Sequence, residues 1–249
     1  AHPLAFNVQR TWLAVAALFV VLIARRGRMW PDSWLAVLVT GFFQTTINFG
    51  STIMAVAGGG AGRASVLVFT MPFWTLLIAW PVLHERVRPL QLVAILLAVA
   101  GLVLTVAPWS WHGDLAPKAW AVLSGFGWAA GTVAVKYFQR DDQFDMLTLI
   151  TWQMAVGVVP LTFLPWLFGV PATDWSVSHA MLLFIIGVVA TAGGFLAWME
   201  VLRWLPAGTA SLNMLAIPVI ALLSSMIVFD ERLAANEWAG MARSAPGSR

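Results

Sequence analysis

Long apolar runs, separated only by short charged or Pro/Gly-containing stretches, dominate this sequence of 249 residues. Hydrophobic residues make up 60% of the chain and charged residues 10%, whereas soluble domains contain about 45–50% and about 25%. A helix of about 20 apolar residues crosses the roughly 30 Å of hydrocarbon in a bilayer. The sequence therefore predicts a protein whose solvent is lipid.

The apolar runs predict helices, because a sheet open to lipid would leave backbone groups unpaired and the runs are too long for barrel strands. We expect an all-α integral membrane protein with eight spans in this sequence. They cover residues 6–24, 33–57, 62–83, 89–107, 116–138, 145–168, 179–203 and 207–229.

Positive charges are unevenly divided between the loops on the two sides of the predicted spans. Eight Lys and Arg residues fall on one side and four on the other, leaving aside the C-terminal tail. Such charges act as topology signals, so we expect no nucleic-acid partner. The excess of positive charge predicts that the loops at 25–32, 84–88, 136–144 and 203–206 are cytoplasmic. We expect the membrane to be a bacterial inner membrane. With no Cys in the chain, disulfides, thiolate metal sites and cysteine nucleophiles are excluded.

An internal repeat appears when the chain is aligned with itself at a shift of 146 residues. Ala61-Gly62-Arg63-Ala64-Ser65 then meets Ala207-Gly208-Thr209-Ala210-Ser211, and Pro72 meets Pro218. Ten of the 26 positions from 61 to 86 are identical without a gap, including Glu85-Arg86 with Glu231-Arg232. Gly41, Thr45 and Phe49 also meet Gly187, Thr191 and Phe195.

The two copies of this repeat have opposite predicted topologies, because an odd number of spans separates them. Inverted repeats are an architecture of secondary transporters, in which two halves enclose a site near the midplane. We divide the chain into a first repeat, 1–110, a second repeat, 111–241, and a tail, 242–249. Each repeat lacks one outer helix relative to the other, so we expect a parent of ten helices; a protein with eight helices is the alternative.

These residues resemble the drug/metabolite transporter superfamily with its paired EamA domains. The resemblance rests on the Ala-Gly-x-Ala-Ser starts, the central Pro and the Glu-Arg ends of the third and eighth spans. Gly58 to Ser65 followed by Phe69-Thr70-Met71-Pro72-Phe73-Trp74 is similar to a branch of amino-acid and metabolite exporters, aromatic amino acid exporters included. The resemblance implies ten helices with both termini in the cytoplasm.

Two kinds of residue are candidates for the transport site. Pro72 and Pro218 are expected to kink their spans at matched depth and so to act in gating or in shaping the cavity, with a static kink as the alternative. Polar residues and deep tryptophans are expected to line an uncharged, aromatic cavity, or otherwise to bind neighbouring helices and fill the core. The cavity candidates are Gln44, Asn48, Trp74, Trp128, Thr132, Trp152, Gln153 and Asn213, with Trp80 and Trp198 as further deep indoles.

The predicted function is a secondary transporter that exports small amphipathic metabolites, amino acids included, by alternating access. A multidrug or toxic-cation exporter of the same fold is the alternative, and a channel or an intramembrane enzyme represents a different class. The motifs Gly-x-x-x-x-Gly-Lys-Ser/Thr, His-Glu-x-x-His and Gly-x-Ser-x-Gly are all missing, so we expect no enzyme and no cofactor. The expected partners are a small-molecule substrate and the lipid bilayer, with a monomer as the assembly. Glu200, the one acid well inside a span, is expected to pair with Arg203.

Overall fold

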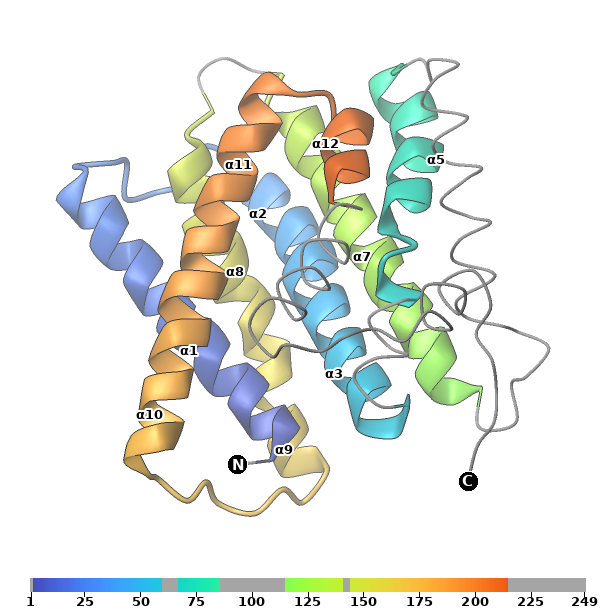
Figure 1. Ribbon diagram of the computed structural model, residues 1–249. Coiled ribbons are helices and arrows are strands. Elements are labelled where there is room, and N and C mark those ends of the chain that lie inside the picture. The colour runs from blue at the N-terminus through green and yellow to red at the C-terminus, as the bar shows by residue number, and fades with distance from the viewer. Residues whose placement is uncertain (1, 60–66, 86–114, 141–143, 215–249) are drawn as a thin grey trace, which may run out of the picture.

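The computed structural model describes residues 2–59, 67–85, 115–140 and 144–214, and all regular elements in these ranges are helices (Figure 1). The expected all-α fold is confirmed. The elements are α1 (Pro3–Ala24), α2 (Trp34–Thr40), η1 (Gly41–Ile47), α3 (Asn48–Gly59), α5 (Met71–Leu83), α7 (Ala116–Phe138), α8 (Met146–Thr162), α9 (Leu164–Leu167), α10 (Val177–Phe184), η3 (Ile185–Gly193), α11 (Gly194–Trp204) and α12 (Ala207–Asn213), where η1 and η3 are π-helical.

Three stretches of the described chain are long and apolar enough to cross a membrane by themselves: Pro3–Ala24, Met146–Leu167 and Val177–Trp204. Each agrees with a predicted span to within a few residues. Helix α7 matches the predicted span 116–138, and the continuous run of α2, η1 and α3 matches 33–57. The predicted span 89–107, and the part of 207–229 beyond residue 214, lie outside the described residues.

Short polar side chains fix where several helices begin. The carboxylate of Asp145 accepts the backbone N–H groups of Leu147 and Thr148 at the start of α8. The hydroxyls of Ser33 and Ser176 accept N–H groups in the same way at α2 and α10. These caps satisfy donors that the first turn of a helix leaves unpaired.

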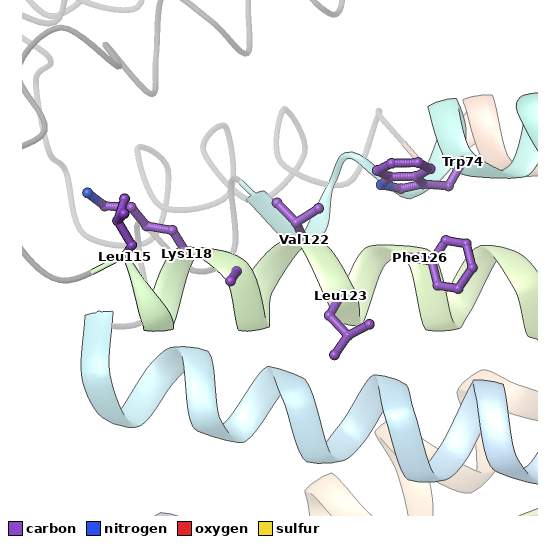
Figure 2. Close-up of a pocket in the computed structure, with 7 residues that line it drawn as sticks. Trp74, Leu115, Lys118, Val122, Leu123 and Phe126 are labelled. Carbon is purple, nitrogen blue, oxygen red and sulfur yellow. The ribbon is translucent and has the colours of Figure 1, made fainter.

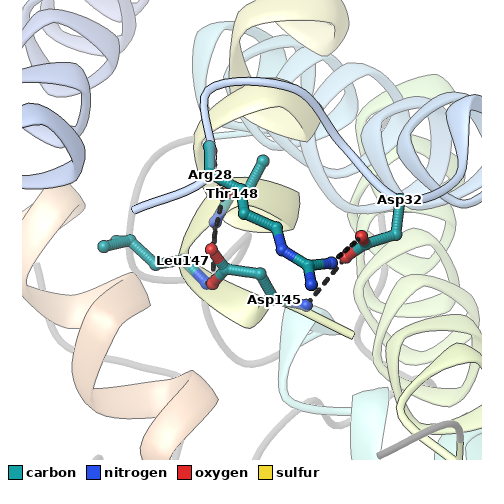
Figure 3. A network of polar contacts seen from close by, with 5 residues as sticks. All are labelled: Arg28, Asp32, Asp145, Leu147 and Thr148. Atoms are coloured by element: carbon teal, nitrogen blue, oxygen red, sulfur yellow. Dashed lines mark hydrogen bonds and ion pairs between the residues drawn. The ribbon is translucent and has the colours of Figure 1, made fainter. Parts of the chain in front are cut away.

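A polar network joins the loop after α1 to the start of α8 (Figure 3). Arg28 forms an ion pair with Asp32 at 2.6 Å, and the second Asp32 oxygen accepts the backbone N–H of Asp145 at 3.0 Å. The backbone N–H of Asp145 lowers the pKa of Asp32, and Arg28 lowers it further. The Thr148 hydroxyl donates to the carbonyl of Arg28. The loop 25–33 is thereby held against α8.

The predicted span 62–83 requires a correction within its described part. Helix α5 begins at Met71, so Pro72 occupies the second position of a new helix and does not kink a continuous one. Residues before it form a turn in which the Thr70 N–H and hydroxyl both donate to the Leu67 carbonyl. Proline at a helix start loses no hydrogen bond, which explains the break at this point. The helix interior instead contains Pro81. Pro218 lies outside the described residues.

The internal repeat is visible in the backbone. The shift of 146 that pairs Gly41 with Gly187 also brings the π-helical segment η1 onto η3. In Figure 1 the run α2–η1–α3 descends while α10–η3–α11 ascends, and α1 and α8 likewise run in opposite directions. The two halves are therefore related by inversion, as the sequence predicts.

Each half packs one of its helices against the π-helical segment of the other half. Helix α8 of the second repeat contacts η1 of the first, and α1 of the first repeat contacts η3 of the second. The two interfaces are equivalent under the repeat, because α1 aligns with α8. This reciprocal packing joins the halves at the centre of the molecule.

Glycines permit the close backbone approach at the first of these interfaces. A Cβ built on Gly157 of α8 would lie 2.5 Å from the carbonyl oxygen of Gly41, and one on Gly131 of α7 would lie 2.5 Å from the Cβ of Gln44. The Thr46 hydroxyl donates to the Gly157 carbonyl at 2.7 Å. Segment η1 is thus enclosed by α7 and α8 with no room for a side chain at these positions.

The two halves also meet at Glu85, which follows the left-handed residue His84 at the end of α5. Its carboxylate accepts the backbone N–H groups of Ala207 and Gly208, at 2.9 and 3.1 Å, and so caps α12. The Ser211 hydroxyl donates to that of Thr75 at 3.1 Å on the same interface. The Glu of Glu85-Arg86 in the first repeat therefore caps a helix of the second repeat.

Substitution of Gly157 by Ala should lower the free energy of unfolding by about 1–3 kcal/mol, because the new methyl group meets backbone atoms that cannot move away cheaply. Thermal unfolding of the purified protein in detergent measures the loss. Gly194→Ala is the matched control, since a Cβ there has no neighbour within 4 Å. Equal melting temperatures for the two variants would show that the close approach is unimportant.

Substitution of Glu85 by Ala should lower the melting temperature by a few degrees, because two N–H groups of α12 lose a charged acceptor worth about 0.5–2 kcal/mol. Glu85→Gln, which keeps one acceptor oxygen, should fall between Ala and the wild type. Glu200→Gln removes a carboxylate from an exposed ion pair and should leave the melting temperature nearly unchanged. A Glu85→Ala variant as stable as Glu200→Gln contradicts the capping role.

Candidate functional site

A pair of fully buried glutamines lies where η1 meets α8. Gln153 Nε2 donates to Gln44 Oε1 at 3.0 Å, and both side chains are 0% exposed. The other polar atom of each amide, Gln44 Nε2 and Gln153 Oε1, has no partner among the described residues. The pair therefore presents one unsatisfied donor and one unsatisfied acceptor within the bundle.

Further unpaired polar atoms gather on the same elements. The hydroxyls of Thr45 on η1 and Thr132 on α7 are buried without a hydrogen-bond partner among the described residues. Most buried hydroxyls elsewhere in these helices bond to a carbonyl of their own helix, as Thr151 does to Leu147. Together, Gln44, Thr45, Thr132 and Gln153 form a group that we call the inner polar cluster.

An aromatic group joins α7 to α11 and α3. The ring of Trp128 lies 5.6 Å from both Phe195 and Trp198 of α11, and Phe195 lies 6.0 Å from Phe49 of α3. The indole N–H groups of Trp128 and Trp198 are buried and have no acceptor among the described residues. Trp128 and Thr132 are one helical turn apart, so the aromatic group continues from the inner polar cluster along one face of α7.

Asn48, predicted as a cavity residue, binds a neighbouring helix. Its amide donates to both the carbonyl and the hydroxyl of Ser124 on α7, at 3.0 Å each. Thr52 shares a 2.6 Å hydrogen bond with the same hydroxyl. Both N–H groups of Asn48 are therefore used in holding α3 against α7.

Trp74 lies in a separate pocket between α5 and α7, which Figure 2 shows. The pocket has a volume of about 540 Å³ and an almost wholly apolar lining. The ring of Trp74 lies 5.7 Å from Phe126, two residues before Trp128 and so on a different face of α7. Figure 2 shows these two rings at one end of the pocket and Leu115 with Lys118 at the other. The structure does not bring Trp74 into the aromatic group.

Trp152 also lies apart from the inner polar cluster. Its indole N–H donates to the Met29 carbonyl at 2.8 Å, and its ring stacks on Trp30 at 5.6 Å and meets Trp34 at 5.3 Å. Trp152 thus anchors the loop after α1. Another deep indole of the sequence prediction, Trp80, is 65% exposed on the outside of the bundle.

Two residues of the sequence prediction, Asn213 and Glu200, are exposed. Asn213, the last residue of α12, is exposed. Glu200 pairs with Arg203 at 3.1 Å on the exposed side of α11 and also accepts the Trp204 indole N–H, so the expected pair is confirmed. Among the described residues, no group of three or more His, Asp or Glu side chains is placed to hold a metal ion.

Arg10 is a further candidate, which the sequence analysis counted only among the four positive charges on the less basic side of the membrane. It lies within α1, where its guanidinium group donates to Asn7 and Thr191 and covers the ring of Phe49 at 4.6 Å. The signal in the sequence was its place inside the predicted span 6–24. A cation at that depth requires an explanation.

Comparison with known proteins agrees with this architecture. The model of the EamA-like transporter family matches residues 1–107 and 117–248. A crystal structure aligns with a TM-score of 0.79 at 16% identity, covering 94% of this chain and 81% of that one. This likeness confirms the fold.

Curated relatives carry transporter names. The uncharacterized transporter YoaV of Bacillus subtilis is 23% identical over 247 residues, which cover 94% of this chain and 82% of the relative. A probable amino-acid metabolite efflux pump of Escherichia coli is 25% identical over 210 residues, covering 80% of this chain and 67% of the pump. With a family model matched across nearly its whole length, this multi-pass membrane protein belongs to the EamA-like transporter family of the drug/metabolite transporter superfamily.

Proposed function

We propose that this transporter exports small amphipathic metabolites, amino acids among them, by alternating access and without a cofactor. The observation that carries the proposal is the inner polar cluster, a set of buried, uncharged and unpaired polar groups beside an aromatic group. We place the protein in a bacterial inner membrane, with the orientation that the charge distribution favours, in which loops 25–32 and 84–88 are cytoplasmic. The name of the Escherichia coli relative supports amino acids as substrates.

The energetics of the inner polar cluster favour a solute-binding role. A buried polar group without a partner costs about 1–3 kcal/mol, and native proteins retain few of them. Several within one region, on η1, α7 and α8, represent a cost that water or a bound solute offsets. Amides and hydroxyls bind polar heads of either sign, while Trp128, Phe195 and Trp198 offer apolar surface. An amphipathic molecule suits this combination.

The arrangement of the halves supports alternating access. Reciprocal contacts of α8 with η1 and of α1 with η3 place equivalent interfaces on the two sides of the pseudo-twofold axis. Rocking of one half against the other exchanges the environments of these interfaces, which is how inverted repeats carry a solute across a membrane. Both interfaces contain π-helical segments, which are frequently found at functional sites. A single protomer contains all the groups named, so we propose a monomer.

A second candidate is the export of organic cations. The observation that favours it is the contact of Trp128 with Phe195 and Trp198, because aromatic rings attract cations to their faces. A transport assay separates the two candidates: uptake of a labelled amino acid should be competed by amino acids, and uptake of a labelled organic cation by organic cations. Enzyme and channel activities have no comparable support among the described residues.

Counterflow in proteoliposomes tests transport directly. Protein reconstituted with unlabelled amino acids inside should accumulate the labelled amino acid transiently, and uptake should saturate and be competed by unlabelled substrate. Protein-free liposomes give the background, and labelled quaternary ammonium compounds report on the second candidate. Flux that is conductive and does not saturate contradicts a carrier.

Substitution of Thr132 by Val should raise the apparent KM about 2- to 10-fold, because the isosteric side chain removes a hydroxyl that we assign to the solute. Its melting temperature should stay equal to that of the wild type or rise, since an unpaired buried polar group is lost. Thr151→Val is the matched control, because that hydroxyl already bonds within its own helix. Unchanged counterflow by the Thr132 variant, with the control also unchanged, argues against the inner polar cluster as the site.

A further inference from the structure

Arg10 places a positive charge inside the helical bundle. It is the eighth residue of α1, about 11 Å along the helix from Pro3. Its side chain points inward, because its partners belong to α1, α3 and η3. A charged side chain at such a depth is costly in a membrane protein and usually marks a substrate or ion pathway.

The hydrogen-bond partners of Arg10 are all neutral. Its Nε and one terminal nitrogen donate to the Asn7 side-chain oxygen at 3.0 and 2.8 Å, and the other terminal nitrogen donates to the Thr191 hydroxyl at 2.9 Å. No carboxylate among the described residues forms an ion pair with the guanidinium group. The positive charge is oriented by its neighbours, yet none of them neutralises it.

The inverted repeat shows that the positive charge is present in only one of two equivalent places in the structure. At the shift of 146, Asn7 aligns with Gln153, Thr191 with Thr45, and Phe49 with Phe195. The inner polar cluster and the surroundings of Arg10 are therefore equivalent places in the two halves. Arg10 itself aligns with Val156, so one of the two equivalent places is neutral and the other is cationic.

The aromatic group runs from Arg10 toward α7. Phe49 lies under the guanidinium group at 4.6 Å and contacts Phe195, which in turn contacts Trp128. The cation provides an anchor for a negatively charged group, and the rings that continue from Phe49 provide a surface for an apolar one. Arginine is well suited to this role because its planar N–H groups match the two oxygens of a carboxylate.

We propose that Arg10 binds the carboxylate of the transported solute. This inference rests on the proposed transport function and narrows it, because the substrates become carboxylic acids or zwitterions, and organic cations are repelled. Asn7 and Thr191 hold the guanidinium group in position, and the solute carboxylate supplies the missing negative charge. Since the acid is already ionised at neutral pH, binding involves no proton or electron transfer.

The test compares matched ligands of the full chain in detergent. Binding of L-phenylalanine and L-leucine is measured by thermal stabilisation and by competition with the labelled acids, alongside the corresponding amino acid amides. The wild type should bind at least one acid about 10- to 100-fold more tightly than its amide, which lacks the negative charge. Equal affinity for acid and amide, or no binding of either acid, overturns the proposal.

Variants of Arg10 assign the preference to this side chain. Arg10→Gln should weaken acid binding about 10- to 100-fold and leave amide binding unchanged, whereas Arg10→Lys should keep a reduced preference for the acid. Arg203→Gln removes an exposed guanidinium that is already paired with Glu200, and it should bind like the wild type. If Arg10→Gln is less stable but keeps the wild-type ratio of acid to amide affinity, the residue is structural and the proposal fails.

Counterflow measurements in proteoliposomes separate this inference from the proposed transport function. A protein that prefers the acid through Arg10 but shows no saturable counterflow has the binding site without the transport activity. Saturable counterflow of acids and amides with equal apparent KM, unchanged in Arg10→Lys and Arg10→Gln, leaves transport in place and overturns the assignment of Arg10.

Discussion

Close backbone approach between helices at glycine positions is the constraint on which this structure depends. Lipid tails are as apolar as leucine, so helices in a bilayer gain little from burying leucine against leucine and associate through tight packing and hydrogen bonds. Gly157 against Gly41 and Gly131 against Gln44 bring α8 and α7 into contact with the backbone of η1. The same approach encloses polar side chains of η1 between two helices, away from lipid. Close packing at glycines therefore accounts both for the association of these helices and for the burial of the inner polar cluster.

The same close approach occurs in both halves of the inverted repeat, but only one of the two equivalent places carries a positive charge, that of Arg10. Gly187 of η3 approaches α1 as Gly41 of η1 approaches α8, and Thr45 and Thr191 occupy the same turn of the two π-helical segments. A gate built from equivalent interfaces can exchange their roles, because each half meets the other through the same contacts. Arg10, which aligns with Val156, breaks the equivalence by adding a positive charge to one of the two places. In the proposed mechanism, the equivalent interfaces account for the movement of the two halves, and Arg10 accounts for which solutes are bound.

Much of the fold could be predicted from the sequence because it depends on local composition and on the repeat. Apolar length placed most of the described helices within a few residues, and the shift of 146 gave the inverted halves. The break before Pro72 was missed because a proline inside an apolar run fits both a kink and a helix start, and the turn at Leu67 to Thr70 decides between them. The π-helical turns have no simple periodic signal, and only the paired glycines mark them.

The candidate site could be predicted only in part, because the sequence indicates how deep a side chain lies but not which neighbours it meets. Depth along a helix can be estimated from the sequence, but the face that a side chain occupies depends on how neighbouring helices cross. Gln44, Gln153, Thr132 and Trp128 therefore come together, whereas Trp74 and Trp152, at comparable depth, point into a separate pocket and toward the loop after α1. Arg10 was overlooked because a single Arg near a predicted span end is usually a topology signal.

The central claim is that the inner polar cluster is reached alternately from the two sides of the membrane. The chain contains no Cys, so Thr132→Cys provides one reactive thiol without background. We expect a membrane-impermeant thiol reagent to modify it both in right-side-out and in inside-out vesicles, and a saturating concentration of substrate to slow the reaction from either side. Modification from one side only, or a rate that substrate does not change, would contradict this account.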